Sequence, residues 1–208
     1  MKEILCFGDS NTWGYSPTTG QRYPANVRWT GVLQADLGSG YHVIEEGLNG
    51  RTTVWEDPIE GDKVGKRHLP VLLQSHAPLD LVVMMLGTND LKMRFSAHAS
   101  DIAAGAGVLV DIIVASGAGQ AGASPEVLLV APPPIAKLSG FEGMFAGGAE
   151  KSLQLGNHYR EAARLRGCHF LDAGDVIRSS DLDGIHLEEK DHLSLGRAIA
   201  GEVKKILR

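Results

Sequence analysis

Apolar positions along the chain follow two kinds of pattern. Short continuous apolar runs are typical of buried strands, and they occupy residues 4–7, 41–44, 80–86, 127–131 and 169–171. Between these runs, apolar residues recur every three or four positions, which predicts helices over 29–37, 69–75, 102–115, 149–166 and 193–207. In the helix predicted over 149–166, we expect the apolar positions to include Leu153, Tyr159 and Leu165.

The predicted strands and helices alternate along the whole chain. Strands that are apolar throughout and alternate with helices are typical of a parallel sheet covered on both faces. Right-handed crossovers then give a three-layer α/β/α sandwich with five strands, and we expect the flavodoxin-like strand order 2-1-3-4-5. The length of 208 residues suits one domain over 1–208. Residues 15–26 and 55–67 have the polar composition of surface insertions, and 116–125 and 136–148 of loops.

Charge and cysteine content exclude several functional classes. The formal net charge of −5 provides little attraction for nucleic acid or anionic membranes, and the basic clusters at 63–67 and 204–208 are short or mixed with other residues. No apolar run reaches the length of a membrane span, and because the chain enters the strand predicted over 4–7 almost at once, we expect no signal peptide. Cys6 and Cys168 form no CxxC pair, so zinc and redox motifs find no support, and we expect no metal and no cofactor. Without a predicted signal peptide or membrane span, a cytoplasmic location is the simplest expectation.

Polar clusters directly follow four of the predicted strands. They lie at residues 9–11, 47–53, 87–90 and 181–186. Because ligands of open parallel sheets bind beyond the carboxyl ends of the strands, we expect these distant segments to meet at one edge.

The first cluster contains Ser10, on the turn after the first strand. A serine there can point its hydroxyl into a cleft, and a helix that begins there directs backbone N–H groups at a developing anion. Serine is equally a favoured helix N-cap, and Gly8-Asp9-Ser10 alone favours that role.

The third and fourth clusters supply the groups that a serine nucleophile needs. Asn89 in the third can offer its amide to an oxyanion, although Gly-Thr-Asn-Asp is also a common turn composition. His186 in the fourth can act as a general base, and Asp183 three residues earlier can hold the imidazole in the required tautomer. His192 is a competing base, but it borders the last predicted helix, where a surface position is expected.

These clusters, taken in order, give the chain a resemblance to the SGNH/GDSL hydrolase superfamily. The resemblance rests on four blocks and extends from residue 4 to the end of the chain: 8–12, the glycine Gly50, 87–90 and 183–186. The segments 27–33, 45–53 and 79–90 and the prolines 132–134 resemble the bacterial arylesterase and acyltransferase-like branch. Asn11 departs from the superfamily pattern, in which many members carry leucine after the serine.

The resemblance implies a role for each block. Ser10 would be the nucleophile of a carboxylic ester hydrolase, His186 its base and then acid, and Asp183 the residue that orients His186. The backbone N–H groups of Ser10 and Gly50 and the side chain of Asn89 would form the oxyanion hole. The implied substrates are short-chain aryl or alkyl esters or acetylated sugars, with acyl transfer to alcohols as a second outcome. The same branch implies a homo-oligomer, such as an octamer.

Residues near these blocks are candidates for contacts with the substrate. They lie beside the motifs or in the loops above them, where local packing or a subunit contact is an equal alternative, and they are Asp9, Asn11, Trp13, Thr88, Lys92, Phe141, Phe145 and Ile185.

Three other functions remain to be weighed against the esterase. A non-catalytic carbohydrate- or ester-binding module can share the fold, because fold alone does not confer activity. A nucleotide or flavin protein would need a phosphate-binding loop after the first strand, and Gly8-Asp9-Ser10 lacks both glycine-rich motifs. A metallohydrolase would need a ligand cluster such as HExxH, which the sequence does not contain.

Overall fold

The central sheet of the computed structural model, which describes residues 1–208, contains five parallel strands. They are β1 (Lys2–Gly8), β2 (Tyr41–Gly47), β3 (Leu81–Met85), β4 (Glu126–Ala131) and β5 (His169–Asp172). Their order across the sheet is β2-β1-β3-β4-β5, and every neighbouring pair is parallel. The predicted parallel sheet and its strand order are therefore confirmed.

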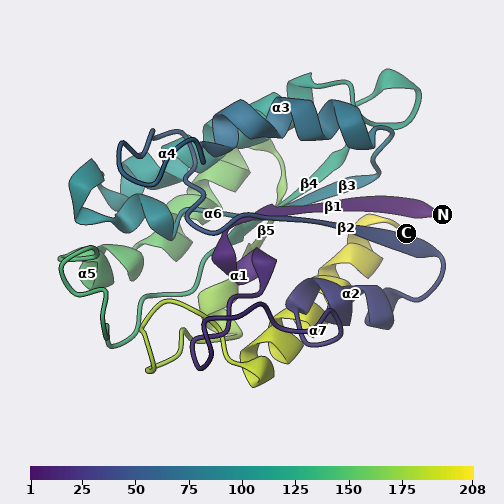
Figure 1. Cartoon of the computed structure of the whole chain (residues 1–208). Helices are drawn as coiled ribbons and strands as arrows, with labels where there is room; N and C mark the ends of the chain where they lie inside the picture. The colour runs from purple at the N-terminus through teal and green to yellow at the C-terminus, as the bar shows by residue number, and fades with distance from the viewer.

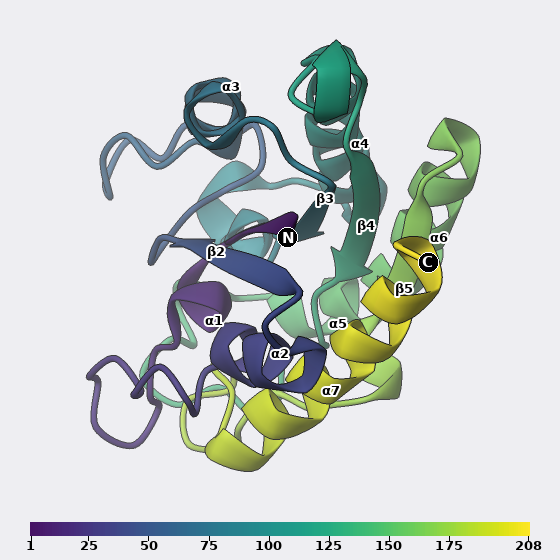
Figure 2. The ribbon, with the colours of Figure 1, turned by 90° about the vertical axis from the view of Figure 1, so that its right-hand side faces the viewer.

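Helices cover both faces of this sheet, as Figures 1 and 2 show. One face carries α3 (Gly65–His76), α4 (Ala99–Ala115) and α6 (Leu155–Arg166), and the other carries α2 (Trp29–Leu37) and α7 (Glu189–Ile206). Two short helices, α1 (Ser10–Trp13) and α5 (Gly148–Ser152), lie near the carboxyl ends of the strands. The three-layer α/β/α architecture is confirmed. None of these helices is both long and apolar enough to cross a bilayer.

Alternate side chains of each strand point to opposite faces, and this divides the core in two. On β1, Leu5 and Phe7 pack with α3, α4 and α6, whereas Ile4 and Cys6 pack with α2 and α7. All four side chains are fully buried. Burial on both faces explains why β1 and β3 read as continuous apolar runs instead of alternating ones. The rigid sheet holds the loops at its carboxyl edge in fixed positions.

The prediction of one continuous helix over 149–166 is wrong, because the structure has two helices there, α5 and α6. The Ser152 hydroxyl donates to the Ala149 carbonyl over 2.6 Å and accepts the Ile135 N–H over 2.9 Å. Such a local bond competes with the helical ladder, and the chain turns at this point. Leu153 is consequently 70% exposed, and Leu165, which lies off the buried stripe of α6, is 66% exposed.

The helix predicted over 69–75 begins earlier, at Gly65, inside the segment expected to be an insertion. The Gly65 N–H donates to the Thr52 carbonyl over 2.9 Å, which fixes the start of α3 beside the loop after β2. The segment before it, from Val54 to Val64, has no helix or strand of its own. It crosses the carboxyl edge of the sheet, where it contributes to the cavity described below.

Candidate active site

Ser10 is the first residue of α1, directly beyond the carboxyl end of β1. The N-cap of this helix is Asp9, whose carboxylate accepts the Asn11 N–H over 3.0 Å. Ser10 is therefore not the cap, and its hydroxyl is available for another partner. The residue is 6% exposed, so the hydroxyl lies just below the surface.

The hydroxyl of Ser10 lies 3.0 Å from Nε2 of His186, across a sequence separation of 176 residues. Nδ1 of the same ring lies 2.6 Å from an oxygen of Asp183. The three side chains therefore form a continuous hydrogen-bonded chain, serine to histidine to aspartate. This geometry lets the imidazole remove a proton from the hydroxyl while the carboxylate holds the ring.

The loop that carries Asp183 and His186 is shaped by Gly184. Its φ is +87°, and a Cβ atom at this position would lie 2.8 Å from the Leu138 backbone, so only glycine fits easily. The tight turn directs the second Asp183 oxygen at the N–H groups of Ile185 (2.8 Å) and His186 (2.9 Å). Burial raises the pKa of Asp183, but the hydrogen bonds from His186 and from both N–H groups outweigh it and hold the pKa below its ordinary value. The carboxylate is thus fixed in its charged form.

Two further donors lie beside Ser10, on the loops after β2 and β3. Gly50 has a φ of +84°, and its N–H donates no hydrogen bond within the chain. The Asn89 amide donates to the Arg51 carbonyl over 3.1 Å, which orients the amide and leaves its second N–H free. Ser10, Gly50 and Asn89 line the same cavity, so free donors are present where an oxyanion would form.

A buried carboxyl group holds the loops after β2 and β3 together. Asp90 accepts hydrogen bonds from the N–H of Thr53, at 3.0 and 3.1 Å, and from the Thr53 hydroxyl. Burial raises the pKa of Asp90 to about 6 despite these bonds, and Asp9 contributes to the rise. Burial likewise raises the pKa of Asp9 to about 6. Because Asp90 follows Asn89 directly, the hydrogen bonds between Asp90 and Thr53 fix Asn89 relative to Gly50.

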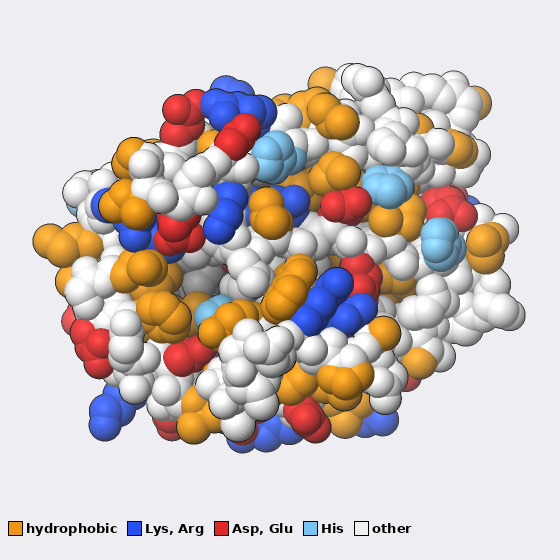
Figure 3. All heavy atoms as spheres, in the orientation of Figure 1, with side chains coloured by type: hydrophobic (Ala, Val, Ile, Leu, Met, Phe, Trp, Pro, Cys, Tyr) orange, Lys and Arg blue, Asp and Glu red, His pale blue; other side chains and the backbone are white.

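The cavity above Ser10 has a volume of about 170 Å³. Figure 3 shows this side of the molecule hollowed, with charged side chains above the hollow and hydrophobic ones below it. Two of the lining residues, Tyr15 and Phe141, lie near His186, with ring centroids 4.1 and 6.3 Å from that of the imidazole. The full lining is Ser10, Tyr15, Asn49, Gly50, Glu60, Asn89, Lys92, Phe141, Met144, Phe145, Ile185 and His186.

Four of the eight candidate substrate-contacting residues line this cavity: Lys92, Phe141, Phe145 and Ile185. The other four do not. Asp9 caps α1 and Thr88 is buried in the turn after β3. Asn11 is 1% exposed and donates to the Ile185 carbonyl, and the Trp13 ring lies beneath the Arg22 guanidinium, 5.2 Å away.

Four lining residues were not predicted from the sequence. Tyr15 and Glu60 lie in the two segments interpreted as surface insertions, Asn49 precedes Gly50, and Met144 lies in the loop before α5. Only Asn49 had a signal, as the neighbour of a motif residue. Each of the two segments interpreted as surface insertions therefore contributes a residue to the lining of the cavity.

His192, the competing base, does not occupy the surface position expected for it. It is fully buried, and its Nδ1 accepts the Trp29 N–H over 3.2 Å at the start of α2. Burial, with Arg28 and His186 nearby, lowers the pKa of His192 to about 4. Its ring fastens α7 to α2 and does not reach the cavity.

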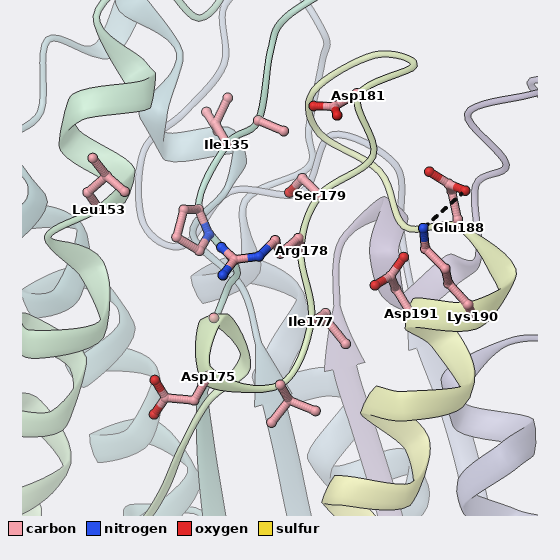
Figure 4. Close-up of a pocket in the computed structure, with 14 residues that line it drawn as sticks. Ile135, Leu153, Asp175, Ile177, Arg178, Ser179, Asp181, Glu188, Lys190 and Asp191 are labelled. Carbon is pink, nitrogen blue, oxygen red and sulfur yellow. Dashed lines mark ion pairs between the residues drawn. The ribbon is translucent and has the colours of Figure 1, made fainter.

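A larger hollow of about 510 Å³ lies beside the segment from Gly174 to Asp181 and the start of α7. In Figure 4, Arg178 extends across it, and Glu188 and Lys190 form an ion pair at its rim. None of Ser10, Asp183 and His186 lines it. Ser10 and His186 line the smaller cavity instead.

The sequence model of the GDSL-like lipase/acylhydrolase family matches residues 6–194. No curated protein sequence matches the chain. Among solved structures, a carbohydrate acetylesterase from Sinorhizobium meliloti is 46% identical, with a TM-score of 0.95, and the match covers 99% of this chain and 100% of that one. The inhibitor-bound aryl esterase of M. smegmatis is 43% identical, with a TM-score of 0.95 and coverage of 99% and 100%. A second Sinorhizobium meliloti carbohydrate acetylesterase family member is 42% identical, with a TM-score of 0.95 and coverage of 100% and 99%.

Proposed function

The chain belongs to the GDSL-like lipase/acylhydrolase family and is a carboxylic ester hydrolase, and we propose that Ser10, His186 and Asp183 are its catalytic triad, acting on short-chain esters. The observation that carries this proposal is the chain of contacts from Ser10 to His186 (3.0 Å) and on to Asp183 (2.6 Å). A non-catalytic binding module would have no need for a serine, a base and a carboxylate in this geometry.

In the proposed mechanism, the Ser10 hydroxyl attacks the ester carbonyl carbon while His186 Nε2 removes its proton. The oxyanion accepts hydrogen bonds from the backbone N–H groups of Ser10 and Gly50 and from the Asn89 amide. Collapse expels the alcohol, which takes its proton from His186, and leaves an acyl-serine. Water then attacks this acyl group, with His186 as base, and releases the carboxylic acid. Asp183 stabilises the imidazolium that forms in each step.

We extend the proposal to acyl transfer. Tyr15, Phe141 and Ile185 place apolar side chains in the cavity that His186 lines. An alcohol held against these side chains would reach the acyl-serine in competition with water, and a new ester would result. Hydrolysis of an ester in water with added ethanol, followed by chromatography of the products, tests this step, and absence of the ethyl ester would contradict it.

We also propose that the chain assembles as a homo-oligomer, such as an octamer. Several large apolar side chains are exposed, including Ile59 (74%) and Val71 (66%). An interface with another copy that covered such side chains would remove apolar surface from water. Light scattering of the purified protein measures the mass directly, and a monomer at working concentration would contradict the assembly.

The test of the proposed function is a fluorophosphonate probe combined with an ester assay. The probe should label Ser10 stoichiometrically, as read by mass spectrometry of the peptide. Ser10→Ala should lower turnover of p-nitrophenyl acetate by about 10⁶-fold, because loss of a nucleophile has that effect in serine hydrolases. His186→Ala should be similarly inactive. Full activity in Ser10→Ala, or labelling at another residue, would refute the assignment.

A further inference from the structure

Arg51, in the turn after β2, is a buried cation that takes no part in the proposed steps. The residue is 4% exposed, and burial lowers the pKa of its guanidinium to about 10, so the group is still charged at neutral pH. Glu46 and Asp9 act on this charge only from a distance, and its Nε donates no hydrogen bond. A buried charge without an ionic partner is costly to the fold. A group buried at this cost, beside residues that line a cavity, is a candidate for a functional role.

The side chain of Arg51 joins the ends of two strands. One terminal nitrogen donates to the carbonyl of Gly8, the last residue of β1, over 2.8 Å, and also to the carbonyl of Glu46, near the end of β2. The guanidinium carbon lies over the Phe7 ring, 4.2 Å from its centroid. These contacts hold the loops that leave β1 and β2 at a fixed separation. Ser10 lies two residues beyond Gly8, so the loop held on the β1 side is the one that carries Ser10.

The main chain of Arg51 is connected to the other two proposed oxyanion donors. Its N–H donates to the Leu48 carbonyl over 3.1 Å, which closes the tight turn that contains Gly50. Its carbonyl accepts the side-chain amide of Asn89 over 3.1 Å. All three proposed donors are therefore joined to this one residue: Gly50 as its neighbour in the chain, Asn89 through a hydrogen bond, and Ser10 through the end of β1.

We infer that Arg51 is the positioning residue of the oxyanion hole, and that its side chain fixes Ser10, Gly50 and Asn89 relative to one another. An oxyanion hole lowers the barrier because its donors are already in place when the charge develops. Without the guanidinium between the two strand ends, the turn after β2 would be free to move. The Gly50 N–H and the carbonyl that orients Asn89 would move with it. This inference rests on the proposed function, because these donors have a role only if Ser10 attacks an ester.

The first test is steady-state kinetics with p-nitrophenyl acetate. Arg51→Met fills a similar volume but donates no hydrogen bond, so the turn loses its anchor. It should lower kcat by about 10²-fold, the effect of a displacement of roughly 1 Å at the reacting groups. KM should stay nearly unchanged, because the bound ester carries no oxyanion. Arg51→Lys keeps the charge but not the planar group that covers Phe7, so it should lose less, about ten-fold.

A double-mutant cycle with Asn89 distinguishes positioning from a purely structural role. If Arg51 acts by placing the Asn89 amide, that amide is already displaced in Arg51→Met. The factor by which Asn89→Ala lowers kcat should then be about ten times smaller in Arg51→Met than in the wild-type protein, a coupling within the range for residues of one network. A residue that only stabilises the fold would leave this factor the same in both backgrounds.

Arg166→Met is the matched control for the loss of an arginine. Arg166 also donates to a backbone carbonyl, that of Ala162, over 3.3 Å, but it lies at the end of α6 and does not line the cavity. Arg166→Met should keep the wild-type kcat and should not change the effect of Asn89→Ala. Where circular dichroism shows that Arg51→Met does not fold, Arg51→Lys takes its place in the cycle, and a smaller effect of Asn89→Ala in that background is again expected.

The outcomes separate this inference from the proposed function. If Ser10→Ala hydrolyses p-nitrophenyl acetate as fast as the wild-type protein, the proposed function fails. If hydrolysis depends on Ser10 but the folded Arg51 variant keeps the wild-type kcat, only the role of Arg51 is wrong. Losses at Arg51 and Asn89 that simply multiply in the double variant would likewise overturn that role.

Discussion

The side-chain amide of Asn11 donates a hydrogen bond to the backbone carbonyl of Ile185 over 3.3 Å, and both residues are buried. Asn11 follows Ser10 and Ile185 precedes His186, so this bond joins two loops that are 174 residues apart. The same residues flank the 3.0 Å contact between Ser10 and His186. The bond therefore fixes the distance on which proton transfer depends.

Asn11→Leu should lower kcat for p-nitrophenyl acetate by about ten-fold and leave KM nearly unchanged. Leucine has a similar volume but cannot donate, so the Ile185 carbonyl loses its partner and the two loops can move apart. Small errors in the placement of reacting groups lower the rate more than they lower binding. Steady-state kinetics measure both constants, and the rate of fluorophosphonate inactivation should fall by the same factor.

A purely structural role for Asn11 gives a different result. In that case Asn11→Leu would lower the melting temperature while kcat and the inactivation rate stayed at wild-type values. Asn157→Leu, on the exposed side of α6, serves as the control for a general effect of the substitution.

Asn89→Ala should lower kcat by about 10²–10³, the loss reported when one oxyanion donor is removed. The amide is oriented by its bond to the Arg51 carbonyl, so its free N–H is fixed before the substrate binds. Because the oxyanion exists only in the transition state and intermediate, KM should change little. Asn89→Asp should be at least as impaired, since a carboxylate would repel the oxyanion. Wild-type kcat in Asn89→Ala would exclude this residue from the oxyanion hole.

The sequence was enough to predict the sheet and to select Ser10, His186 and Asp183, whose side chains the structure brings into contact. The strands are buried on both faces and so read as apolar runs, and Asp183 lies three residues from His186 in one loop. Ser10, Gly50 and Asn89 each follow a strand, and a parallel sheet places all strand ends at one edge. Topology alone therefore brings these residues together.

The walls of the cavity depend on contacts that leave no such pattern. Glu60 reaches the cavity because it pairs with Lys92, 32 residues away, and neither residue lies in a periodic segment. Tyr15 is held over His186 in a long polar loop whose composition resembles that of any surface insertion. His192 illustrates a boundary error instead. It lies on the stripe of α7 that also contains Leu195 and Ile199, but the helix had been predicted to begin one residue later.

Two buried threonines provide a matched pair for testing the hydrogen bond between the Thr53 hydroxyl and Asp90. Thr53 and Thr12 are both fully buried, but the Thr53 hydroxyl donates to Asp90 whereas the Thr12 hydroxyl has no partner. Valine has nearly the same shape as threonine. Thr53→Val should lower the free energy of unfolding by about 1.5–3 kcal/mol, as expected for a bond to a charged group. Thr12→Val should be neutral or stabilising, because it removes a buried polar atom that forms no bond.

Urea denaturation at pH 7.5 measures both free energies of unfolding. That pH lies above the raised pKa of Asp90, which is about 6, so the carboxylate is charged. Equal destabilisation by the two substitutions would mean that the Thr53–Asp90 bond contributes nothing beyond packing. Any loss of activity should accompany Thr53→Val alone, since the Thr12 hydroxyl makes no bond to Asp90 or to Asn89.

The buried His192 should make stability depend on pH. Its pKa in the folded chain is about 4, below its ordinary value of 6.5. Between these values the unfolded chain binds a proton at His192 that the folded chain excludes. The contribution of the neutral histidine to the free energy of unfolding is therefore complete above pH 6.5 and is lost as the pH falls to about 4. The size of the loss is about 3 kcal/mol. Asp9 and Asp90 act in the opposite direction, because their raised pKa values favour the folded chain on acidification.

Comparison with His192→Gln isolates the histidine from these opposing carboxyl groups. Glutamine is neutral at every pH and can accept the Trp29 N–H through its side-chain oxygen, so the packing of α7 on α2 is retained. The free energy of unfolding of the wild-type protein, minus that of the variant, should fall by about 3 kcal/mol between pH 7 and pH 4. If plots of the free energy of unfolding against pH were parallel for the wild-type protein and His192→Gln, His192 would titrate alike in the folded and unfolded chains, in spite of its burial.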